Sequence, residues 1–121
     1  GLSAGTATVR EGSGKEATHP RADVFPVNPK NQDGCKDNTE LMYLREPHML
    51  HNLRQRYQRD DIYTSIGPIL IAINPYKALD MCGAEAIAHM IEAEKPDDLP
   101  PHIFKISQSV LRVASVKSLS R

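Results

Sequence analysis

Four consecutive residues, Asn74-Pro75-Tyr76-Lys77, place an amide, an aromatic ring and an amine in one short segment, which we call the corner. The corner directly follows Ile69-Leu70-Ile71-Ala72-Ile73, an apolar run of strand length. Proline cannot donate to a sheet ladder, so the chain must turn there, and ligands of open α/β sheets bind just beyond the carboxyl ends of strands. These residue types suit a heterocyclic base with attached phosphates. A plain strand-ending turn explains the spacing at least as well, because Asn-Pro is a common turn dipeptide.

A glycine-rich stretch near the N-terminus, Gly12-Ser13-Gly14-Lys15, invites comparison with a phosphate-binding loop. That loop requires a glycine five positions before its Gly-Lys pair, a Ser or Thr directly after the pair, and a preceding strand. Val9 and Glu16 occupy the two positions, and we expect no strand before them. We therefore interpret the stretch as exposed linker.

The other candidate residues have no neighbours in the sequence with which they could form a metal site or a catalytic site. Cys35 and Cys82 lie 47 positions apart, and neither belongs to a Cys-x-x-Cys pair or another metal-ligand spacing. The carboxylate pairs Asp60-Asp61 and Asp97-Asp98 stand beside helix or proline boundaries, where capping and solvation explain them. His89 lies beside the apolar stripe of an expected helix, which is more typical of a structural or exposed histidine than of a catalytic one. We predict no metal site, no catalytic residue and no self-contained active site.

The charge balance limits the class of partner. Fifteen basic and fifteen acidic side chains give a formal net charge of zero with the histidines neutral, which argues against a nucleic-acid duplex or an anionic membrane. No apolar run reaches the length of a membrane span, and the N-terminus lacks the layout of a signal peptide. The cysteine usage leads us to expect a reducing, intracellular compartment. The first residue is not methionine, which suggests a processed or partial chain.

The apolar residues are unevenly distributed. Leu, Ile, Val and Phe make up about 22% of the chain, close to the disorder-prone range, and five of them lie in residues 1–37. Residues 1–37, rich in Gly, Ser, Thr and Ala and then in Pro and Asn, are predicted to be an irregular or flexible leader. Residues 38–112 could pack, and residues 113–121 are expected to form a divergent tail.

A helix is predicted to start at Glu46-Pro47, with proline in the first turn and a carboxylate near the positive end of the helix dipole. The apolar residues that follow recur at helical spacing and predict one stripe of an amphipathic helix: Met49, Leu50, Leu53 and Tyr57. Arg54, Arg56 and Arg59 fall mostly off that stripe. Such a basic helix could contact nucleic acid, but the acidic pair that follows at once favours a solvated face.

Two segments have strand character, residues 62–66 and residues 69–73, with Gly67-Pro68 between them. A run that is apolar on both faces belongs inside a sheet covered on both sides, yet two strands alone are marginal in water. Helical spacing predicts a second helix from about Ala84 that ends at Glu94-Lys95-Pro96, and a third helix opened by Pro100-Pro101. We therefore expect an α/β fold with two short strands, about three helices and a sheet that is incomplete in this chain.

Several blocks of this sequence resemble the myosin motor head, in the stretch just upstream of that family's phosphate-binding loop. The resemblance extends over residues 24–112, and the blocks occur in the family's order and spacing. The matching blocks are Val27-Asn28-Pro29, Asp37 to Leu44, Leu50 to Tyr57, Ile62-Tyr63-Thr64, Ile73 to Lys77, and Pro100 to Ser107.

The resemblance implies a P-loop NTPase-like motor that hydrolyses ATP with Mg²⁺, moves on actin filaments, binds light chains and works at the cytoskeleton in the cytoplasm. It also implies that Asn74, Pro75, Tyr76 and Lys77 contact the adenine of the nucleotide. This sequence departs from the family at Ala78, where an arginine is usual, and at Cys82, where an aromatic residue is usual. Because an aromatic partner contributes about 0.5–1.5 kcal/mol, we expect weakened adenine binding.

The groups that act on the phosphates are not among the matched blocks. Phosphoryl transfer depends on backbone amides, a lysine and Mg²⁺ around the γ-phosphate, so we do not expect this chain alone to hydrolyse ATP or to bind ATP or Mg²⁺ tightly. We interpret it as a fragment or truncated product of a myosin heavy chain. Two alternatives stay open: a non-catalytic motor remnant that binds a protein partner through an exposed strand edge, and an unrelated basic-helix module that binds nucleic acid.

Overall fold

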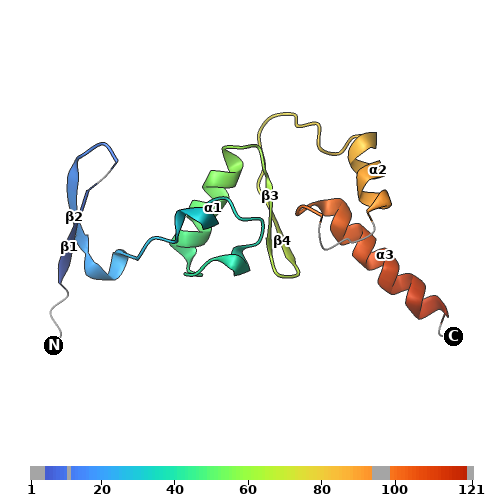
Figure 1. Ribbon diagram of the computed structural model, residues 1–121, viewed down its shortest axis with the longest axis horizontal. Coiled ribbons are helices and arrows are strands. Elements are labelled where there is room, and N and C mark those ends of the chain that lie inside the picture. Colours follow the sequence, from blue (N-terminus) through green and yellow to red (C-terminus); the bar gives the residue numbers. More distant parts are fainter. Residues whose placement is uncertain (1–4, 11, 94–98, 120–121) are drawn as a thin grey trace.

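The computed structural model describes residues 5–10, 12–93 and 99–119. The described chain is elongated, with one hairpin near the N-terminus, a long helix at the opposite end, and a helix and a second hairpin between them (Figure 1). The helices and strands are β1 (Thr6–Arg10), β2 (Glu16–Pro20), α1 (Glu46–Tyr57), β3 (Tyr63–Ile66), β4 (Ile69–Ala72), α2 (Ala84–Glu92) and α3 (Ile103–Leu119). The strands form two separate two-stranded sheets, β1–β2 and β3–β4. The expected α/β chain with an incomplete sheet is confirmed.

Strands β1 and β2 form a hairpin where the composition led us to expect an irregular leader. β1 and β2 pair antiparallel along their whole length. Threonine and valine favour strands, and Gly14 turns the chain at φ +84°, a conformation that glycine adopts without strain. A strand therefore does precede Gly12–Lys15, contrary to our expectation. That stretch leads into β2 rather than into the helix that a phosphate-binding loop requires.

Helix α1 begins at Glu46 as predicted, but it buries a different face from the one expected. Its buried side chains are His48, Asn52 and Arg56, which recur every four residues. Leu50, from the predicted apolar stripe, is 68% exposed in the described chain. The prediction of a solvated face for the arginines is therefore wrong at Arg56, which is buried. The physical reason is that the segment beside α1 presents backbone carbonyls, which polar donors can satisfy and leucine cannot.

Strands β3 and β4 lie within the two segments predicted to be strands. They pair antiparallel from Tyr63↔Ala72 to Ile66↔Ile69, and Gly67 turns the chain at φ +54°. On the outer side of β3, Ser65 N donates to Lys36 O at 2.9 Å. The outer edge of β4 pairs with no other strand among the described residues, and Ile69 is 62% exposed. The incomplete sheet is thus open at β4.

Helices α2 and α3 form the other end of the described chain (Figure 1). Gln108 Nε2 donates to Met90 O at 3.3 Å and joins the two helices. Helix α3 continues to Leu119, through most of the segment expected to be a divergent tail. The expected end of α2 at Glu94-Lys95-Pro96, and the pair Asp97-Asp98, lie outside the described residues.

The interior of the described chain is more polar than apolar. Its buried aliphatic side chains are Leu41, Ile62, Met90 and Leu99. Its buried polar side chains are Asn28, Asn38, His48, Asn52, Arg56, Thr64 and His102. Directional hydrogen bonds therefore carry much of the packing around α1. Within the described ranges, no helix is both long enough and apolar enough to cross a membrane.

Candidate functional site

The corner is a turn closed by a side-chain hydrogen bond, and it begins two residues after the end of β4. Ile73 still pairs with the sheet, because its N–H donates to Ile62 O at 3.0 Å. Asn74 Oδ1 then accepts from Tyr76 N at 2.9 Å, which is the turn that asparagine side chains favour. Tyr76 takes a left-handed conformation, with φ +51°. Its side chain is left almost fully in solvent, and the residue is 89% exposed.

The C-terminal end of α1 holds the backbone of the corner. The Tyr57 hydroxyl donates to Pro75 O at 3.2 Å and lies 3.5 Å from Asn74 O. Tyr57 belongs to the predicted apolar stripe of α1, and the residue is partly exposed here. Its function in this structure is to tie the helix to the corner.

The amine of the corner forms an ion pair. Lys77 Nζ lies 2.6 Å from Asp60 Oδ1, and both side chains are about half exposed. Asp60 stands three residues past the end of α1, with φ +65°, and its N–H donates to Tyr57 O at 3.1 Å. Exposed pairs of this kind contribute about 0.2–1 kcal/mol. We expected Asp60 to serve in capping and solvation, because it stands beside a helix boundary in the sequence. The contact between positions 60 and 77 leaves no periodic signal from which it could have been predicted.

Two groups of the corner remain available to a ligand. The Tyr76 ring offers an open aromatic face, and Asn74 Nδ2 donates to none of the described residues. A hollow of about 540 Å³ borders the corner through Tyr57 and Ile73. The remaining lining residues come from α1: Pro47, Leu50, His51, Leu53 and Arg54. The arrangement can stack on a flat ring and donate a hydrogen bond to it.

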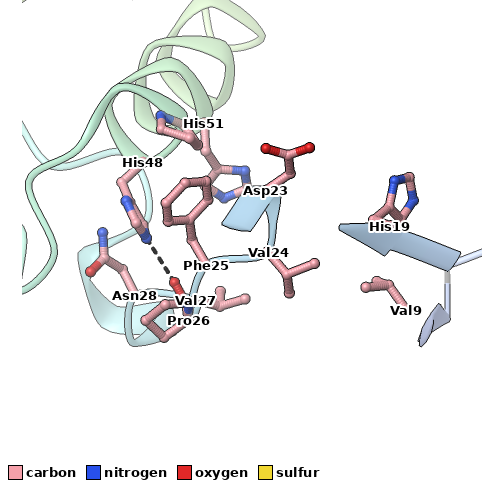
Figure 2. A pocket seen from close by; sticks show the side chains of 11 residues that line it. Val9, His19, Asp23, Val24, Phe25, Pro26, Val27, Asn28, His48 and His51 are labelled. Carbon is pink, nitrogen blue, oxygen red and sulfur yellow. Dashed lines mark hydrogen bonds between the residues drawn. The ribbon is translucent and has the colours of Figure 1, made fainter. Parts of the chain in front are cut away.

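A second hollow, of about 450 Å³, lies between the first hairpin and α1 (Figure 2). Two of the histidines that line it have partners within the chain. His48 Nε2 donates to Pro26 O at 2.7 Å, beside the ring of Phe25. His51 Nε2 lies 3.4 Å from Asp33 Oδ1. The hollow contains no residue of the corner, so we place the candidate site at the corner.

The remaining candidate groups lie apart from the corner. Cys35 and Cys82 are free thiols. Burial, and then the nearby Glu40 charge, raise the pKa of the Cys35 thiol above its ordinary value. His89 is exposed on α2. No group of three or more His, Cys, Asp or Glu side chains within the described ranges could hold a metal ion.

Comparison with known proteins decides the family. The myosin head (motor domain) family matches residues 35–119 of this chain. This chain belongs to the myosin head family. The match begins after the first hairpin and continues past residue 112, where we expected the myosin pattern to end.

Several myosin heavy chains are similar to this one. A probable myosin heavy chain of Encephalitozoon cuniculi is 45% identical over 95 residues, which cover 78% of this chain and 6% of that protein. The non-muscle myosin-2 heavy chain of Acanthamoeba castellanii is 40% identical over 107 residues, or 87% of this chain and 7% of the relative. Unconventional myosin-VI of Sus scrofa is 36% identical over 98 residues, or 81% and 8%. This myosin head chain thus spans less than a tenth of the length of these relatives.

Proposed function

We propose that this chain is the segment of an actin-based, ATP-driven motor that contacts the adenine of the nucleotide. The proposed contacts are Asn74, Pro75, Tyr76 and Lys77. The observation that carries the proposal is the shape of the corner. Its turn is closed by the Asn74 side chain and leaves Tyr76 89% exposed. A stacked base would cover that ring, and Asn74 Nδ2 lies in the same turn to donate to a ring nitrogen.

The residues of the corner fit the base better than the phosphates and the metal. One aromatic stack and two hydrogen bonds total about 2–4 kcal/mol, which corresponds to millimolar or weaker affinity. Asp60, the carboxylate beside the corner, is paired with Lys77, and the described residues offer no carboxylate cluster to Mg²⁺. We therefore assign no step of ATP hydrolysis to these residues, and we propose that hydrolysis needs groups beyond them.

The proposed partners and location follow from the family. We propose that the motor to which this segment belongs binds actin filaments and light chains and works at the cytoskeleton in the cytoplasm. None of the described residues is assigned to either partner. The support is the family match together with relatives that are named as myosin heavy chains.

The proposal is tested by an NMR titration of the full 121-residue chain with adenosine. We expect saturable shifts at the amides of Asn74, Tyr76 and Lys77 at millimolar adenosine. We also expect a loss of about two- to tenfold in affinity for Tyr76→Ala, because stacking contributes about 0.5–1.5 kcal/mol. Tyr43→Ala is the matched control, since Tyr43 lies beside His48 rather than at the corner. No response at the corner, or equal losses in both variants, would contradict the adenine contact.

The open edge of β4 favours a second candidate function, a non-catalytic motor remnant that binds an extended segment of another protein. Added strands bind such edges through main-chain hydrogen bonds, and Ile69 is 62% exposed beside this one. A peptide that pairs with β4 should protect its outward amides from hydrogen exchange. Adenosine should leave those amides unprotected, so the two functions give different exchange maps.

A further inference from the structure

The ion pair at the corner has a consequence for which part of a nucleotide the corner can recognise. Lys77 Nζ lies 2.6 Å from Asp60 Oδ1, closer than an ordinary amine–carboxylate hydrogen bond. The carboxylate therefore occupies one of the three donors of the ammonium group and neutralises its charge. A phosphate that approached Lys77 would therefore meet the negative charge of Asp60, whose side chain is half exposed.

The backbone around Asp60 keeps its carboxylate in place. Asp60 N donates to Tyr57 O, and Ile62 N donates to Asp60 O, each at 3.1 Å. The residue adopts φ +65°, a conformation that Asp and Asn tolerate better than most other side chains do. Tyr57 also anchors Pro75 through its hydroxyl. The C-terminal end of α1 therefore holds both Asp60 and the turn that carries Lys77.

We propose that Asp60 is a specificity residue that makes the corner recognise the base of a nucleotide and not its phosphates. The inference rests on the proposed adenine contact. Asp60 acts through Lys77 by neutralising the ammonium group, while the Tyr76 ring and Asn74 Nδ2 remain free to meet the base. The corner thus binds adenosine and ATP alike.

The first test uses the unmodified full chain and three probes: adenosine, ATP without Mg²⁺, and inorganic tripolyphosphate. Shifts are followed at the amides of Asn74, Tyr76 and Lys77 and at the Lys77 side chain. We expect adenosine and ATP to bind within about twofold of each other and tripolyphosphate to leave the corner unshifted, because an exposed ion pair opposes phosphate by about two- to fivefold. ATP binding more than fivefold tighter than adenosine, with Lys77 shifting, would overturn the inference.

The second test removes the carboxylate. Asp60→Asn keeps a side chain that tolerates the left-handed backbone, and we expect it to tighten ATP about two- to fivefold while adenosine is unchanged. The gain should fall with added salt, as exposed charge interactions do, and should disappear in the double variant Asp60→Asn, Lys77→Met.

Asp61→Asn is the matched control, because it changes the net charge by the same amount but removes a group 3.9 Å from Arg56 rather than one paired with Lys77. An equal gain in Asp61→Asn would reduce the effect to net charge and overturn the inference. A normal adenosine response without any gain in Asp60→Asn would overturn the inference alone. Absence of an adenosine response at the corner would overturn the proposed function, and the inference with it.

Discussion

The region around α1 and the region formed by α2 and α3 are held together by different forces. Around α1, Arg56 donates to Thr64 Oγ1, Gly34 O and Tyr63 O at 2.8–3.1 Å. Asn52 Nδ2 likewise donates to Cys35 O and to Asn38 Oδ1. Between α2 and α3 the contacts are mostly apolar, beside a groove of about 260 Å³. The contacts around α1 are therefore directional hydrogen bonds, whereas those between α2 and α3 are apolar contacts that tolerate small shifts.

The difference shows what each kind of contact can specify. The buried Arg56 guanidinium can donate to its three acceptors in only one geometry. Loss of any of these hydrogen bonds leaves a buried polar group unpaired. Apolar side chains such as Ile87, Ile91 and Leu111, which line the groove, tolerate small shifts because their attraction is not directional. We therefore expect the region around α1 to keep one geometry, including the end of α1 that holds the corner.

The largest expected effect comes from Arg56→Met. The variant leaves Gly34 O and Tyr63 O without their donor, and we expect the free energy of opening around α1 and β3 to fall by about 3 kcal/mol. Amide hydrogen exchange measures this region by region. Arg54→Met is the control, since Arg54 is exposed on the same helix. A loss below 1 kcal/mol, or an equal loss in α3, would remove the distinction between the regions.

A smaller, local effect is expected from His102→Ala. His102 Nδ1 accepts from Phe104 N at 3.1 Å at the start of α3, and His102 Nε2 donates to Met81 O at 3.0 Å. Loss of this cap should cost about 1 kcal/mol, seen as faster exchange in the first turn of α3 only. His89→Ala, exposed on α2, is the control. Faster exchange around α1 as well would show that the two regions are coupled.

The smallest expected effect is a local loss of stability around Asp37 at low pH. Burial would raise the pKa of Asp37, but hydrogen bonds from Thr39 and from Gly67 N, with the Lys105 charge, leave that pKa below its ordinary value. The carboxylate thus stabilises the folded chain above about pH 4, and this contribution is lost as the pH falls through the lowered pKa. Exchange at Thr39 and Gly67 should rise first on acidification. Asp37→Asn should abolish that step, whereas Asp23→Asn, which is exposed, should leave it intact.

Local signals in the sequence identified most helices and strands. Glu46-Pro47 marked the first residue of α1, and the β-branched runs at 62–66 and 69–73 contain β3 and β4. Composition misled at residues 6–20, because threonine and glycine occur both in linkers and in hairpins. The corner was found from its residue types and its place after a strand. Its pairing with Asp60 and Tyr57 was not, since those contacts join distant positions.

The amino-acid sequence alone determined the order of the elements, the place of the corner and the myosin resemblance, because propensities, turn residues and motif blocks are local properties of a chain. Only the tertiary structure decided that α1 turns His48, Asn52 and Arg56 inward and that Lys77 meets a carboxylate. Helical spacing divides α1 into two faces but does not name the partner of either. The partners of the inward face include the backbone carbonyls of Pro26, Gly34 and Cys35, which come together only once the chain has folded.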